Sequence, residues 1–159
     1  MAGIDRPAQT AHNRRLSSPS TSGALDPPTL AMLASLFASA FLAATVLPGG
    51  SELVLYAVLA RDASLYLPAL AVGTLGNTLG ALTSYGLGRM IPQRYTPSAR
   101  VLCWARRGGV PILLLSWVPV IGDALCVAAG WLRLPLARSA ACIAIGKFAR
   151  YWVVAQAAL

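Results

Sequence analysis

The sequence predicts an all-α integral membrane protein built as an inverted repeat, in which each unit is a re-entrant helical hairpin plus a spanning helix. Three observations predict this fold. Hydrophobic residues make up 57% of the 159-residue chain and charged residues only 11%, with a mean hydropathy of +0.64. A soluble surface would then be short of polar groups, whereas a bilayer accepts apolar ones. The apolar runs are interrupted by Pro and Gly, and one such interruption recurs 71 residues later.

Residues 1–29 are rich in Ser, Thr, Pro and Arg and lack apolar periodicity, so they are expected to form a disordered tail. Residues 30–159 form the membrane domain, with repeats at about 30–91 and 110–159. Arg14-Arg15 ahead of this domain also resembles the start of a signal peptide, with Ala38-Ser39-Ala40 as its cleavage site. Cleavage there would destroy the first repeat, so the uncleaved chain is favoured.

The first hairpin is predicted around the tip Pro48-Gly49-Gly50-Ser51-Glu52, where Pro and Gly interrupt the helix and a carboxylate follows. Its arms are Leu30–Leu47 and Leu53–Ala60, which as helices would be about 27 Å and about 12 Å long. The second arm cannot cross a hydrocarbon core of about 30 Å. The pair therefore suits a hairpin that enters and leaves the membrane on one side.

The second hairpin is predicted around Pro119-Val120-Ile121-Gly122-Asp123, which again has a Pro, a Gly and an acid four residues after the Pro. Its arms, Val110–Val118 and Ala124–Leu132, would each be about 14 Å long. The alternative is one kinked spanning helix over Val110–Leu132. Irregular backbone at membrane depth is tolerated only where protein buries it or a wet cavity borders it, so the two tips are expected to cover each other.

Leu65–Gly88 and Ser139–Leu159 are the predicted spanning helices. The first carries a ridge of small residues that lets another helix backbone approach closely, namely Gly76, Gly80, Ser84 and Gly88. The segment Ala71–Leu75 also aligns with Ala144–Phe148, at an offset of 73 residues. One crossing per unit inverts the second unit relative to the first, an architecture that transporters use to place a site at the repeat interface.

The formal net charge is +8, and the arginines cluster between the apolar runs. Seven lie in the middle loops, against four on the opposite face: Arg89, Arg94, Arg100, Arg106, Arg107, Arg133 and Arg138 against Arg6, Arg14, Arg15 and Arg61. The positive-inside rule then predicts cytoplasmic middle loops and external termini. Nucleic-acid binding is not expected, because no basic stripe is interleaved with aromatics on a polar segment.

Four charged residues fall inside apolar runs: Glu52, Asp123, Lys147 and Arg150. Each would cost roughly 2.5 to 3.5 kcal/mol at the centre of a spanning helix, so each is expected to face protein or a wet cavity. Lys147 and Arg150 are three residues apart and can grip one phosphate-sized anion together. An anion that competes for these bases should leave the acids protonated, which gives a route to proton-coupled transport. The alternative is a buried ionic cluster with a structural role.

Enzyme activity is not expected. Gly122-Asp123 resembles the end of the GxGD signature of intramembrane aspartyl proteases, but Val120 stands in place of the first Gly. Ser116 has no histidine in the membrane to activate it, since the chain's one histidine is His12. The cysteines form no CxxC pair, so neither a metal nor another cofactor is expected; they are Cys103, Cys126 and Cys142.

The chain resembles the YqaA branch of the DedA (SNARE-associated, VTT-domain) membrane protein family over about Leu30 to Val154. The resemblance is carried by the Pro48–Glu52 tip, Gly76–Gly80, Gly88-Arg89, Leu113–Asp123, Ala129–Trp131, Gly146-Lys147 and Arg150-Tyr151. It implies a multi-pass protein of the bacterial inner membrane with two opposed re-entrant hairpins. It also implies transport, because characterised members move lipid phosphates such as undecaprenyl phosphate across the bilayer with proton coupling.

The chain departs from the wider DedA pattern at the second hairpin. That pattern has arginines three residues before and three after the hairpin proline, where this chain has Ser116 and Gly122. Glu52 keeps the acidic position of the first hairpin, and either Lys147 with Arg150 replaces the missing arginines or the substrate differs. The expectation is a flippase for an anionic lipid, with membrane lipids and protons as partners and self-association left open. The alternative is a non-transporting protein that maintains membrane integrity or acts through envelope partners.

Overall fold

The computed structural model describes residues 26–45, 50–92, 94–95 and 98–157. Most of these residues are helical and none lies in a β-strand, which confirms the all-α prediction for the described part of the chain. The elements, with η for a 3₁₀-helix, are α1 (Pro27–Thr45), α2 (Ser51–Arg61), η1 (Ala63–Leu65), α3 (Tyr66–Met90), α4 (Ala99–Gly108), η2 (Val110–Trp117), α5 (Ile121–Trp131) and α6 (Leu136–Ala157). Most of the predicted tail, together with the tip residues Pro48 and Gly49, lies outside the described residues.

The first helix, α1, begins at Pro27, three residues before the predicted start of the membrane domain at residue 30. Proline is tolerated there because the first helical N–H groups have no partner within the helix. The 19 residues of α1 form one of two described segments that are long and apolar enough to cross a membrane; the other is Ala63–Met90. At about 28 Å, α1 could make a full crossing, so a re-entrant first hairpin stays a prediction.

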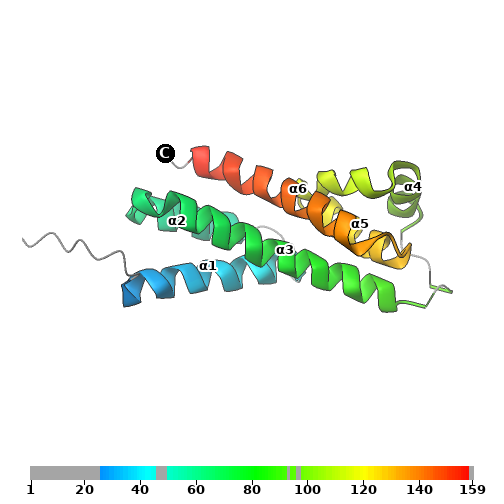
Figure 1. Ribbon diagram of the computed structural model, residues 1–159, viewed down its shortest axis with the longest axis horizontal. Coiled ribbons are helices and arrows are strands. Elements are labelled where there is room, and N and C mark those ends of the chain that lie inside the picture. Colours follow the sequence, from blue (N-terminus) through cyan, green and yellow to red (C-terminus); the bar gives the residue numbers. More distant parts are fainter. Residues whose placement is uncertain (1–25, 46–49, 93, 96–97, 158–159) are drawn as a thin grey trace, which may run out of the picture.

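The longest helix, α3, runs through the middle of the molecule, with α1 on one side and α6 on the other (Figure 1). Its glycines allow other backbones to come close. A methyl group on Gly76 would lie 2.7 Å from the carbonyl oxygen of Phe37, and one on Gly80 would lie 2.5 Å from that of Phe41. Gly88 makes the same kind of contact with Val127 of α5. The small-residue ridge therefore packs against α1 at Gly76 and Gly80 and against α5 at Gly88.

The predicted second hairpin consists of two short segments, η2 and α5, that contact each other. A methyl group on Gly122 would lie 2.6 Å from the carbonyl oxygen of Ser116, which shows how closely the two segments pack. Between them, Val120 has a φ of 64° and a ψ of −56°, and the N–H of Ile121 donates to the carbonyl oxygen of Pro119 over 2.6 Å. This is a γ-turn of the rare positive-φ type. The alternative of one continuous kinked helix over 110–132 is therefore wrong.

Two apolar cores lie along the long helices. The first includes Leu36, Leu55, Ala69 and Tyr151, and the second includes Leu113, Leu125, Ala81 and Ile143. Both α3 and α6 contribute to each core, with different halves of the helix. These two helices therefore join the N-terminal unit to the C-terminal unit.

Large apolar side chains remain exposed on the outside of α3, where Leu67 is 72% exposed and Leu75 59% exposed. Such a surface is typical of a helix in contact with lipid. The last helix, α6, has 22 residues but is not among the segments that are apolar enough to qualify as spans. The charged residues Arg138, Lys147 and Arg150 lower its hydropathy, and its crossing stays a prediction.

Candidate functional site

The centre of the site is Lys147, near the middle of α6. Its side chain is 1% exposed, and its Nζ atom donates to Oδ1 of Asp123 over 2.8 Å. Asp123 lies in the first turn of α5, where the helix dipole favours a negative charge. Because an unpaired ammonium group would be costly in this position, the carboxylate is the group that makes burial of Lys147 tolerable.

A second ion pair lies one turn further along α6. Arg150 donates to Oε1 of Glu52, which lies in the first turn of α2. The guanidinium side chain is 11% exposed and the carboxylate side chain 30% exposed. The two acids thus occupy equivalent places, each in the first turn of the short helix that follows a predicted tip. In both pairs the acid is more exposed than the base.

The structure brings the four predicted charged residues together, but in two separate pairs. Lys147 and Arg150 share one face of α6 because they are three residues apart. Each is already bonded to a carboxylate, one from α5 and one from α2. An anion that took the place of the carboxylates on both bases would leave the two acids without counter-ions. The two ion pairs can therefore support an exchange in which an anion replaces the carboxylates on Lys147 and Arg150.

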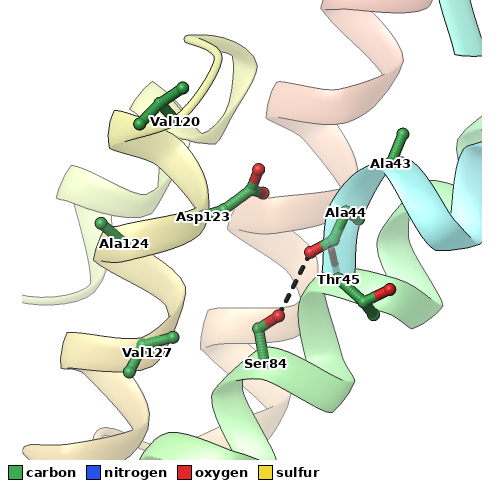
Figure 2. A pocket seen from close by; sticks show the side chains of 8 residues that line it. All are labelled: Ala43, Ala44, Thr45, Ser84, Val120, Asp123, Ala124 and Val127. Carbon is green, nitrogen blue, oxygen red and sulfur yellow. Dashed lines mark hydrogen bonds between the residues drawn. The ribbon is translucent and has the colours of Figure 1, made fainter. Parts of the chain in front are cut away.

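A pocket of about 240 Å³ opens beside Asp123 (Figure 2). It is bordered by the C-terminal end of α1, by α3 and by the start of α5, through Ala43, Ala44, Thr45, Ser84, Val120, Asp123, Ala124 and Val127. Ser84 donates from Oγ to the carbonyl oxygen of Ala44 over 3.2 Å, which ties α3 to α1 at the pocket wall. The described flank of the first tip and the second tip thus border the same pocket.

The predicted tip residues have different surroundings. Gly122 is buried against η2, and no side chain larger than hydrogen fits there without displacing backbone. At Gly50, no atom of the described residues lies within 4 Å of where a methyl group would stand. Pro119 is exposed and accepts the hydrogen bond of the γ-turn.

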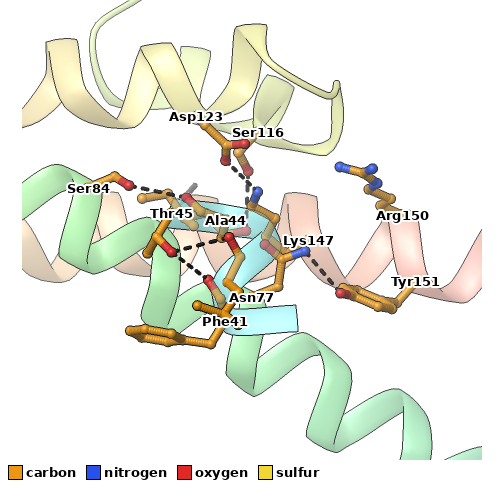
Figure 3. A network of polar contacts seen from close by, with 12 residues as sticks. Phe41, Ala44, Thr45, Asn77, Ser84, Ser116, Asp123, Lys147, Arg150 and Tyr151 are labelled. Carbon is orange, nitrogen blue, oxygen red and sulfur yellow. Dashed lines mark hydrogen bonds and ion pairs between the residues drawn. The ribbon is translucent and has the colours of Figure 1, made fainter. Parts of the chain in front are cut away.

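Sequence reasoning missed a neutral polar pair next to the ion pairs. Asn77 of α3 donates from Nδ2 to the hydroxyl oxygen of Tyr151 over 3.1 Å, and both residues are buried (Figure 3). Tyr151 directly follows Arg150 on α6. The 73-residue offset between the repeats would have indicated this position, because it aligns Asn77 with Arg150. The first unit therefore has the amide of Asn77 at the position where the second unit has the guanidinium group of Arg150.

Ser116, which stands where the wider DedA pattern has an arginine, has a structural contact. It is buried, and its hydroxyl donates to the carbonyl oxygen of Ile143 on α6 over 3.3 Å. A methyl group on Gly146 would lie 2.5 Å from the same hydroxyl oxygen. The position is thus filled by packing between η2 and α6, with no room for an arginine side chain in this arrangement.

Comparison with known proteins decides the family. The chain is 46% identical over 127 residues to the inner membrane protein YqaA of Escherichia coli (strain K12), and the alignment covers 79% of this chain and 89% of that protein. The chain belongs to the YqaA family. The YqaA protein of Shigella flexneri matches to the same extent. An uncharacterized protein of Haemophilus influenzae is 44% identical over 130 residues, which cover 75% of this chain and 82% of that protein.

Membership in the YqaA family confirms the branch that the sequence resemblance indicated. It also places the protein in the bacterial inner membrane, in agreement with its two membrane-capable helices. No family model and no solved structure matches the chain.

Proposed function

We propose that the protein is a transporter or flippase that moves an anionic, phosphate-bearing lipid across the inner membrane with proton coupling, and that it is not an enzyme. The observation that carries this proposal is the pairing on α6. Lys147 and Arg150, one turn apart, are neutralised by carboxylates from two different segments. A phosphate group has the charge and the several acceptor oxygens needed to replace both carboxylates at once.

Proton coupling follows from the exchange. When a phosphate takes over the two bases, Glu52 and Asp123 lose their counter-ions in apolar surroundings, where a protonated acid is favoured over a carboxylate. Anion and protons would then enter the site together and keep its net charge near zero. Both carboxylate side chains are partly exposed, Glu52 by 30% and Asp123 by 24%, which supports access of protons to them. The pocket beside Asp123 supports access of the anion.

The membrane geometry proposed for this mechanism is the inverted repeat with two opposed re-entrant hairpins. Its support is that η2 and α5 are too short to cross the membrane, at about 16 Å each, and contact each other. The equivalent placement of Glu52 and Asp123 in the first turns of α2 and α5 also supports it. In this geometry the ion pairs lie at the interface of the two units, where transporters hold their substrates.

A second candidate function is a non-transporting role in membrane integrity or in contacts with envelope partners. It is favoured by the complete pairing of the four charges and by the presence of Ser116 and Gly122 in place of the two DedA arginines. Under this alternative the ion pairs only hold α2 and α5 against α6. Replacing a pair with apolar residues of similar size would then preserve function.

Reconstitution into liposomes tests the proposal. Purified protein should translocate a labelled lipid phosphate, and a comparison of several head groups would identify the substrate class. Glu52→Gln and Asp123→Asn should each abolish transport while the protein still inserts and purifies as a folded species. Transport retained in both variants would refute the proposed site and favour the structural alternative.

A further inference from the structure

The short helix α4 is strongly amphipathic. Leu102 and Ala105 are buried against the rest of the protein, whereas Arg100, Arg106 and Arg107 are exposed. The helix contacts η2 and α5, so its apolar side already has a partner within the protein. Its basic side has none among the described contacts, since the recorded ion pairs of the described residues lie elsewhere.

This basic side lies at the arginine-rich end of the molecule. Figure 1 shows α4 at the end where α3 finishes and α6 begins. Seven arginines belong to this end, and the segment 89–122 contains no acid: Arg89, Arg94, Arg100, Arg106, Arg107, Arg133 and Arg138. The positive charge is therefore uncompensated locally. In an inner membrane protein, the end of a membrane-capable segment such as Ala63–Met90 is also where lipid headgroups lie.

The surface of α4 is shaped as well as charged. A groove of about 380 Å³ lies beside the helix, lined by the exposed Ala99 and Cys103, the largely buried Leu102, and the arginines Arg106 and Arg107. Trp104, which is 41% exposed, lies three residues before Arg107 and four after Arg100, so it shares a face with both. Tryptophan is enriched at the level of the headgroups, and arginine binds phosphate through two parallel hydrogen bonds.

We infer that α4 is a docking site for the phosphate of an anionic phospholipid in the adjacent leaflet, separate from the ion pairs of α6. Arg106 and Arg107 hold the headgroup phosphate, Ala99 and Cys103 contact the start of the acyl chains, and Trp104 lies at the depth of the headgroups. The occupant is a lipid and not a free anion, because the groove combines exposed apolar side chains with guanidinium groups. The inference goes beyond the proposed transport function and does not depend on it.

The test measures which lipid lies next to Trp104. Full-length protein is placed in nanodiscs with equal amounts of phosphatidylglycerol and phosphatidylcholine, and only one of the two lipids carries brominated, fluorescence-quenching chains. Subtracting the signal of a Trp104→Phe variant isolates Trp104 from the other tryptophans of the chain. Phosphatidylglycerol should be enriched about fivefold over phosphatidylcholine near Trp104, the ratio that corresponds to about 1 kcal/mol.

A matched pair of variants separates the groove from the general positive field. Arg106→Gln with Arg107→Gln should remove most of the enrichment, whereas Arg133→Gln with Arg138→Gln removes the same charge at the same end and should preserve it. All four arginines are exposed, so folding does not depend on them. Equal quenching by both lipids in the native protein would overturn the inference. So would an equal loss of enrichment in the two double variants, because the field alone would then account for it.

Discussion

Lys147 of α6 is bonded to Asp123 of α5 over 2.8 Å while only 1% of its side chain is exposed. The ammonium group of Lys147 is therefore buried, and the carboxylate that compensates its charge belongs to a residue 24 positions earlier in the chain. Removing one partner of a buried pair costs more than removing both, because the remaining charge is left without compensation. The first prediction follows from this asymmetry.

Asp123→Asn is expected to lower the free energy of unfolding by about 3 kcal/mol, since the ammonium group of Lys147 would stay buried without a counter-ion. The double variant Asp123→Leu with Lys147→Met should lose less, because no charge remains. Unfolding of the detergent-solubilised protein in a titration with sodium dodecyl sulfate, followed by circular dichroism, measures both. A double variant less stable than Asp123→Asn would show that the pair contributes net stability beyond mutual compensation.

The helix contacts made through glycine give a second prediction. A methyl group on Gly130 would collide with the carbonyl oxygen of Tyr85, and one on Gly88 would collide with that of Val127, so α3 and α5 would have to separate. Gly88→Ala and Gly130→Ala should each cost about 3 kcal/mol or prevent folding, since backbone cannot move aside as a side chain can.

Gly86 is the matched control, because no atom in the described part of the chain lies within 4 Å of its added methyl group. Gly86→Ala on the same helix should be neutral or stabilise the protein by up to about 1 kcal/mol, as alanine is the better helix former. The same unfolding titration compares the three variants. Similar stabilities for Gly86→Ala and Gly88→Ala would contradict the close contact of α3 with α5.

The tip of the second unit gives a third prediction. Val120 is a β-branched residue with a φ of 64° and a ψ of −56°, a sparsely populated conformation that costs roughly 1–3 kcal/mol. Its side chain is 61% exposed, so little packing is lost when it is removed. Val120→Gly should therefore raise the free energy of unfolding by about 1 kcal/mol, after the greater chain entropy of glycine is counted. A destabilised Val120→Gly variant would argue against the γ-turn at this tip.

Much of the candidate site could be predicted from local sequence. A charged residue within an apolar run is visible without any knowledge of the fold, and its energetic cost predicts that it will be buried or paired. Glu52, Asp123, Lys147 and Arg150 were all identifiable in this way. The family could also be predicted, because the motifs around Pro48–Glu52 and Leu113–Asp123 are specific, and the comparison with YqaA proteins confirms it.

Which acid pairs with which base could not be predicted. Glu52 and Arg150 are 98 residues apart, and Asn77 and Tyr151 are 74 apart. Such contacts depend on how α2, α3 and α6 pack, and local patterns do not specify helix rotation. The start of α1 also differs from the prediction, because residues 27–29 fall in the predicted Pro-rich tail, whereas proline is compatible with a first helical turn.

The central claim is that Glu52 and Asp123 exchange with a phosphate on α6 and carry protons as they do so. Proteoliposomes with a labelled lipid phosphate in one leaflet and a pH gradient across the membrane test it most directly. Native protein and the Glu52→Asp variant, which keeps a carboxylate, should translocate the lipid at a rate that depends on the gradient. Glu52→Gln should lose both the transport and its pH dependence while remaining folded. Gradient-dependent transport of undiminished rate in Glu52→Gln would contradict the claim.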